Sequence, residues 1–146
     1  MRYRCNWLCA ILAVPVLVVT TVRADDQDTI DYRQHIMKGL NAQSAILGQI
    51  VAGAVPNDQL AQHLDALASI ASTALKSFEP KVAGGESKPA VWNDWADFSK
   101  RMNEFSQKAA HAAKLAHAQG PDAAMTSMME ALTCKSCHDV YRTEKK

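Results

Sequence analysis

The 146-residue sequence contains only four cysteines, and it lacks the sustained alternation of apolar and polar residues that predicts β-strands. Cys5 and Cys9 lie in an apolar segment near the N-terminus, so the rest of the chain contains a single pair. A structural zinc site normally needs a second pair of ligands, and a thioredoxin-like dithiol is expected to follow a strand. The remaining pair therefore fits neither class of site.

A long run of one charge is also absent. The chain has 16 basic and 15 acidic residues, so its formal net charge is +1. No basic run or stripe is present, which argues against nucleic acid as a partner. Internal repeats and low-complexity segments are absent too, and the length suits a single domain.

The remaining cysteines belong to a motif near the C-terminus, Cys134-Lys-Ser-Cys137-His138. This is the spacing of covalent haem attachment, in which each thiol forms a thioether with one haem vinyl group. On a helix the three residues fall within an arc of about 100°, so the imidazole can also reach the iron. We therefore predict one covalent haem c on Cys134 and Cys137, with His138 as an axial ligand.

The N-terminal segment has the order of features of a secretory signal peptide. Two arginines precede an apolar run over residues 7–22, and Ala24 stands before an acidic pair. Pro15 interrupts the run, which is short for a membrane span of about 20 residues. We expect residues 1–24 to be cleaved after Ala24 and residues 25–146 to form the mature domain. Because covalent haem attachment follows export, we expect the bacterial periplasm.

Apolar residues three or four positions apart predict helices through most of the mature chain. Breaks are expected at Gly53, at the Gly84-Gly85 loop and at Gly120-Pro121. The expected helices are Thr29–Ala52 with Asp28 as its N-cap, a second that Asn57 or Asp58 caps and that ends near Phe78, Pro89–Gln119, and Pro121–Thr143. The apolar face of the second helix is expected to consist of Leu60, Leu64, Leu67, Ala71, Ala74 and Phe78. Because short connections make neighbours antiparallel, the predicted fold is all-α, an up-down-up-down four-helix bundle with covalently bound haem c.

The first expected helix has a distinctive inward stripe. Its members are Ile30, Arg33, Met37, Leu40, Ser44, Leu47 and Val51. His35 lies about 200° round the helix from Met37 and should face away from the haem. Met102 is expected in the core, and His63, His111 and His117 are expected to be solvated.

Three segments resemble the class II c-type cytochromes, for which cytochrome c′ is a standard four-helix example. They are Arg33-Gln34-x-x-Met37-Lys38, Lys88-Pro89-Ala90-Val91-Trp92 and Cys134-x-x-Cys137-His138-Asp139-x-Tyr141-Arg142. The resemblance covers nearly all of residues 25–146. It implies the same bundle, with the haem motif near the C-terminus.

The family has two branches that differ at the iron. In the low-spin branch, a methionine early in the first helix coordinates the iron opposite the histidine, giving a six-coordinate electron carrier. In the cytochrome c′ branch, the iron is usually five-coordinate, and an apolar side chain covers a distal face that admits nitric oxide or carbon monoxide. Methionine can also cover that face without bonding the metal. The sequence around Met37 looks more like the low-spin branch, so the resemblance implies Met37 and His138 as axial ligands.

Arg33 lies one turn before Met37 on the same face, where its guanidinium can pair with a haem propionate. Matching arginine and glutamine residues of the family lie near the propionates, which implies this role for Arg33 and Gln34. The alternative for Arg33 is a surface salt bridge.

These residues predict an electron-transfer protein rather than an enzyme. A neutral thioether favours ferrous iron, so ligation by Met37 and His138 suits one-electron transfer. The stripe around Met37 offers no positioned acid or base for proton transfer. We expect periplasmic or membrane-bound redox proteins as partners, and a monomer or homodimer. A five-coordinate cytochrome c′ that binds nitric oxide or carbon monoxide is the alternative.

Overall fold

The computed structural model describes residues 25–144, so the expected signal peptide at residues 1–24 lies outside them. The elements are α1 (Asp26–Val51), α2 (Leu60–Ala74), the 3-10 helix η1 (Leu75–Phe78), α3 (Ala90–Asn93), α4 (Trp95–Gln119), α5 (Pro121–Ala131) and α6 (Cys134–Tyr141). Within these residues, no helix combines the length and the apolar character needed to cross a membrane.

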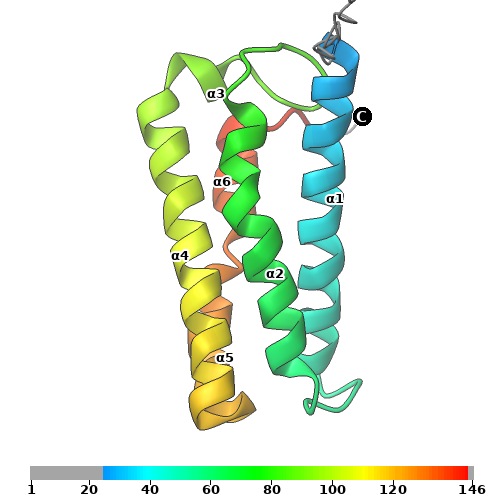
Figure 1. Cartoon of the computed structure of the whole chain (residues 1–146), viewed down its shortest axis with the longest axis vertical. Coiled ribbons are helices and arrows are strands. Elements are labelled where there is room, and N and C mark those ends of the chain that lie inside the picture. The colour runs from blue at the N-terminus through cyan, green and yellow to red at the C-terminus, as the bar shows by residue number, and fades with distance from the viewer. Residues whose placement is uncertain (1–24, 145–146) are drawn as a thin grey trace, which may run out of the picture.

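The long helices lie side by side along the long axis of the molecule and alternate in direction (Figure 1). α2 packs against α1 and α4, and α4 packs against α5. α5 and α6 follow one another along the fourth position of the bundle. The predicted all-α, up-down-up-down arrangement is confirmed.

The core is continuous through α1, α2 and α4. The predicted apolar face of the second helix is buried along its whole length, from Leu60 to Phe78. α4 and α5 pack against each other, and most of the residues that the second half of α4 and α5 bury are small. The buried alanines there are Ala109, Ala112, Ala113 and Ala116 on α4 and Ala124 and Ala131 on α5.

α1 begins three residues earlier than expected. Asp25 is its N-cap: the Asp28 amide donates to the Asp25 carboxylate at 2.8 Å, and the Asp25 amide donates back to Asp28 at 3.3 Å. Asp28 is therefore not the N-cap but the third residue of the helix, where it completes a capping box with Asp25. The prediction chose the wrong acid because an aspartate can occupy either position. The predicted stop is confirmed, because Gly53 follows the helix with a φ of 67°.

Two other details of the predicted helices are wrong. No side chain caps α2, so neither Asn57 nor Asp58 has the expected role. At the end of α1, Val51 is exposed and Ile50 is buried in its place. The predicted stripe alternates steps of three and four residues, a mean of about 3.5, so it drifts away from the buried face of a helix with 3.6 residues per turn.

The third and fourth predicted helices are each interrupted. At Asp94 the backbone leaves the helical region, which separates the short α3 from α4. Leu132 and Thr133, with ψ angles of 34° and 41°, separate α5 from α6. Neither break contains a glycine or proline, so no local signal predicted them. The haem motif therefore lies on a separate helix of eight residues.

The loop between η1 and α3 is tied to the end of α6. The Lys88 amide donates to the Tyr141 carbonyl at 2.9 Å, and the Thr143 amide donates to the Glu86 carbonyl at 2.9 Å. An ion pair of 2.9 Å joins Arg142 to Glu86. The only long connection that the sequence predicted thus helps to hold the haem-motif helix.

Replacing Leu64 tests the core of the bundle. Leu64 is fully buried on α2, so Leu64→Ala should destabilise the holoprotein by about 2–5 kcal/mol through lost contacts and the cavity left behind. Urea unfolding followed by circular dichroism measures the change. Gln62→Ala, on the exposed face of the same helix, is the control and should change stability by less than about 0.5 kcal/mol. Equal losses in both variants would contradict this packing.

Candidate haem-binding site

The residues of the predicted haem motif occupy one turn and a half of α6. Cys134 is exposed, while Cys137 and His138 are half-buried, and both cysteines are free thiols. Burial raises the pKa of the Cys137 thiol. Burial, followed by the nearby Arg142 guanidinium, lowers the pKa of His138. The imidazole is therefore held in its neutral form, which has the lone pair that a metal requires.

Two adjoining cavities lie against this helix. Their volumes are about 430 Å³ and 350 Å³. The first reaches along α1, α4 and the start of α6, and the second reaches along α1, the loop before α3 and the end of α6. Both cavities are lined by Met37, Asn41, Met102, Cys137 and His138. The structure thus brings the motif of α6 and the stripe of α1 to one place.

The chemistry of the lining fits a haem. A haem needs apolar walls for its ring and positive charge for its two propionates. The walls include Leu40, Val91, Phe98 and Phe105. Three acidic side chains line the cavities, Asp97, Glu86 and Glu104, against six basic ones, Arg33, Lys38, Lys100, Arg101, Lys108 and Arg142. This excess of positive charge contrasts with the near balance of the whole chain.

Met37 lies where the sequence predicted, half-buried on the face of α1 that borders both cavities. His35 is exposed, and its Nδ1 lies 2.7 Å from the Asp31 carbonyl, so it faces away as expected. Ser44 lines the first cavity, but its hydroxyl donates to the Leu40 carbonyl at 2.9 Å. Met102 is buried as predicted, and it also reaches both cavities.

Arg33 has partners that the sequence did not predict. Its side chain is buried, and the guanidinium donates to the carbonyls of Val82 at 3.0 Å and Gly84 at 3.4 Å. The same group lies 5.3 Å from the ring centre of Phe78 and 5.2 Å from that of Trp92. A surface salt bridge, the alternative considered for this residue, is therefore wrong. Arg33 also lines the second cavity, and its propionate role stays a prediction.

Gln34 is half-buried beside the second cavity and close to the loop. A Cβ atom placed on Gly85 would lie 2.8 Å from the Gln34 Nε2 atom, and Gly85 has a φ of 62°. The loop can therefore approach Gln34 only with a glycine at this position. Whether a propionate is bound by Gln34 also stays a prediction.

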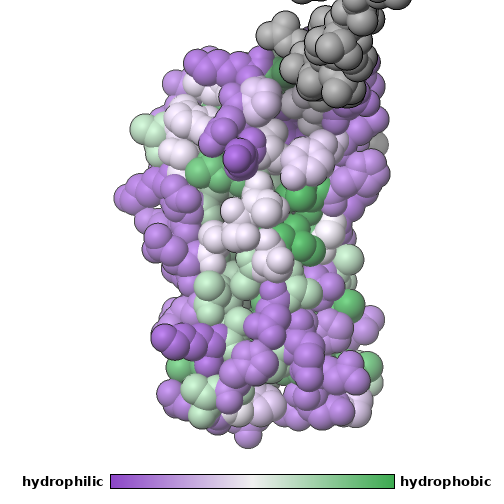
Figure 2. All heavy atoms as spheres, in the orientation of Figure 1, coloured by the Kyte–Doolittle hydropathy of each residue, from purple (hydrophilic) through white to green (hydrophobic). Residues whose placement is uncertain are grey.

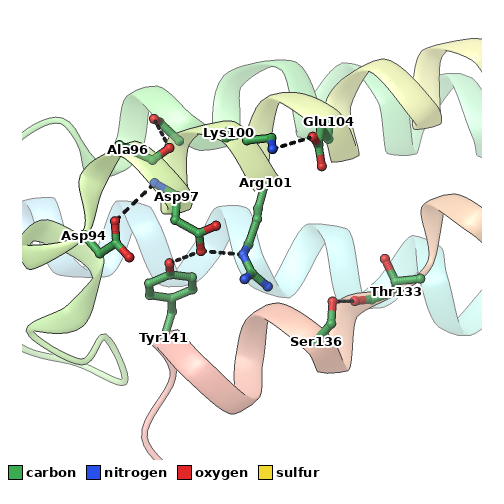
Figure 3. A network of polar contacts seen from close by, with 10 residues as sticks. Asp94, Ala96, Asp97, Lys100, Arg101, Glu104, Thr133, Ser136 and Tyr141 are labelled. Atoms are coloured by element: carbon green, nitrogen blue, oxygen red, sulfur yellow. Dashed lines mark hydrogen bonds and ion pairs between the residues drawn. The ribbon is translucent and has the colours of Figure 1, made fainter.

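Sequence reasoning missed two polar residues of the site, Asp97 and Arg101 on α4. Both line the first cavity, and the Arg101 Nε donates to the Asp97 carboxylate at 2.6 Å (Figure 3). The Tyr141 hydroxyl of α6 donates to the same carboxylate at 2.5 Å. The spacing of four residues between Asp97 and Arg101 predicts a helical ion pair, but nothing local predicts its contact with Tyr141.

Comparisons with known proteins identify the family of the chain. A family model described as cytochrome c′ matches residues 28–142. A cytochrome c′ of Rhodospirillum rubrum is 33% identical over 143 residues, covering 92% of this chain and 96% of the relative. Another, of Alcaligenes xylosoxydans xylosoxydans, is 26% identical over 125 residues, covering 84% of this chain and 98% of the relative.

Solved structures give the same result for the fold. The ferric cytochrome c prime from Alcaligenes xylosoxidans superposes with a TM-score of 0.76 at 26% identity, covering 84% of this chain and 98% of that chain. Cytochrome c prime from Shewanella frigidimarina has a TM-score of 0.72 at 25% identity, covering 84% of this chain and 100% of that chain. Together with the family match over most of its length, this likeness shows that the chain belongs to the cytochrome c′ family and is a class II c-type cytochrome with one covalent haem c.

Proposed function

We propose that this cytochrome joins its haem to Cys134 and Cys137, binds the iron through His138 on one side, and covers the other side with Met37 without a permanent bond. When bound, the haem supplies one-electron chemistry and an iron site that can hold nitric oxide or carbon monoxide. The observation that carries this proposal is the cytochrome c′ match over residues 28–142, because that branch is usually five-coordinate. The match favours this alternative over the low-spin interpretation that the sequence around Met37 indicated.

The α1 side of the first cavity, lined by Met37, Leu40, Asn41 and Ser44, has no acid or base, which supports gas binding there rather than catalysis. The Ser44 hydroxyl donates to its own helix at Leu40, so it does not offer a free donor to a bound ligand. Leu40 and Phe105 add apolar surface to the same cavity. Peroxide chemistry requires a positioned acid or base. Apolar side chains over the iron favour a neutral diatomic ligand instead. We therefore propose no enzymatic activity.

A second function remains a candidate because of one observation: Met37 and His138, from α1 and α6, line the same two cavities. A thioether bonded to the iron would make the site six-coordinate and low-spin, which suits electron transfer. Under either proposal we infer one-electron exchange with periplasmic or membrane-bound redox proteins. We also propose export to the periplasm, with cleavage after Ala24, and a monomer or homodimer.

The spectrum of the ferric holoprotein at neutral pH decides between the two. Under the first proposal the wild type is high-spin, and Met37→Leu is high-spin too. The rate of carbon monoxide binding to Met37→Leu should change severalfold, because the variant differs only in the side chain that covers the iron. A low-spin wild type would overturn the first proposal and support the second, in which Met37→Leu becomes high-spin and gains rapid binding of carbon monoxide. Met129→Leu is the control: this residue is 60% exposed on α5 and lines neither cavity.

If the wild type is low-spin and Met37→Leu leaves its spectrum unchanged, the sixth ligand must be sought elsewhere. Met102 then becomes the first candidate, because it lines both cavities.

The covalent attachment is tested by acid denaturation followed by extraction with organic solvent. The haem should stay with the polypeptide, and mass spectrometry should give residues 25–146 plus one haem. Cys134→Ala should retain a single thioether, while Ser136→Ala, within the same motif, should retain both. Complete extraction of haem from the wild type would contradict attachment, and a mass that includes residues 1–24 would contradict cleavage.

A further inference from the structure

The haem-motif helix is not held by continuity with the rest of the bundle. Leu132 and Thr133 interrupt the fourth arm, so α6 begins afresh at Cys134. With eight residues, α6 is too short to fix its own direction through a long packing face. Its orientation must come from contacts with neighbouring elements, which are the backbone hydrogen bonds to the loop before α3 and the side-chain contacts with α4.

Tyr141 makes the most extensive of these contacts. It lies three residues after His138, close to one turn along the same helix. Its side chain is buried, and its ring packs edge-on against Phe98 of α4 with a centroid distance of 5.1 Å. Its hydroxyl donates to the Asp97 carboxylate at 2.5 Å. One residue of α6 thus contacts α4 through both its ring and its polar end.

Asp97 is itself held in place (Figure 3). The Arg101 Nε donates to the same Asp97 oxygen that receives the Tyr141 hydroxyl, at 2.6 Å. The Asp97 amide donates to the Asp94 carboxylate at 3.4 Å, in the N-cap of α4. The carboxylate is therefore attached to a rigid helix end and to a cation one turn further along it.

The protonation states match a charge-assisted hydrogen bond. The hydrogen bonds from Tyr141 and Arg101 lower the pKa of Asp97. Burial, and then the hydrogen bond to Asp97, raises the pKa of Tyr141 to about 12. At neutral pH a protonated phenol donates to an ionised carboxylate, which is a stronger contact than one between neutral groups.

The network also reaches the haem anchors. Asp97 and Arg101 line the first cavity together with Cys134, Cys137 and His138. A change at Asp97 therefore acts on the helix that carries the iron ligand and both thioethers.

We propose that Asp97 is a positioning residue for the haem: through Tyr141 it sets the orientation of α6, and so the direction in which the His138 imidazole meets the iron. The inference rests on the proposed ligation by His138. Residues that orient a metal ligand affect the metal although they do not touch it. Asp97 does so from a helix other than that of the ligand.

The test is the ferric EPR spectrum of holoprotein variants, which reports the geometry of the axial ligands whether or not Met37 is bonded. Tyr141→Phe removes the hydroxyl and keeps the ring on Phe98, and Asp97→Asn removes the charge. Each should shift the g-values in the same direction and broaden the signal. The shift in the double variant should be smaller than the sum of the two single shifts, because both single changes act on the same contact.

Two control variants separate positioning from stability. Asp65→Asn removes another contact between an aspartate and a different helix, the 2.7 Å pair with His117 of α4, away from both cavities. Leu64→Ala destabilises the core without touching α6. Both should leave the g-values unchanged, even where urea unfolding shows a loss of stability.

Each adverse outcome has its own meaning. Unchanged g-values in Tyr141→Phe and Asp97→Asn would overturn the positioning role, whatever happens to stability. Shifts of equal size in the Asp65→Asn control would overturn it as well, because any helix contact would then suffice. If His138→Gly leaves the wild-type spectrum unchanged, the proposed ligation by His138 fails instead, and the positioning role fails with it.

Discussion

The buried guanidinium of Arg33 is the contact on which the geometry of the second cavity depends. It donates to the Val82 and Gly84 carbonyls and contacts the rings of Phe78 and Trp92, so it fastens the long loop to α1. The loop in turn holds the end of α6 through Glu86 and Lys88. Both carbonyls belong to half-buried residues, so leaving them without this donor costs at most about 1–3 kcal/mol each. One side chain thus links the first helix to the haem motif.

The two sides of the bundle are stabilised in different ways. Around α2 the side chains are close-packed, with Leu60, Leu64 and Leu67 fully buried. Around α6 the same bundle leaves cavities of about 430 Å³ and 350 Å³, lined by residues that range from buried to exposed. A cofactor that binds only the folded chain adds its binding free energy to stability. The apolar side therefore establishes the fold, and the haem side gains its stability when the cofactor is bound.

Much of this arrangement is visible in local sequence signals. Gly53 and Gly120-Pro121 were predicted to end helices, and both predictions are confirmed. A helix end that depends on the positive φ of a glycine or on a proline is set by residues within one turn, so the local sequence is enough to predict it. The stripe from Leu60 to Phe78 is buried as its spacing predicts. No such signal marks the helix breaks at Asp94 and at Leu132-Thr133, so the separate helix that carries the haem motif could not be predicted.

The sequence by itself determined the haem motif and the all-α class, because attachment chemistry and helical periodicity depend on residues close together in the chain. Only the tertiary structure decided the partners of Arg33 and of Asp97. Arg33 meets carbonyls about fifty residues away, and Asp97 meets Tyr141 44 residues away. Such contacts depend on how helices and loops pack against one another, and no spacing along the chain encodes that packing.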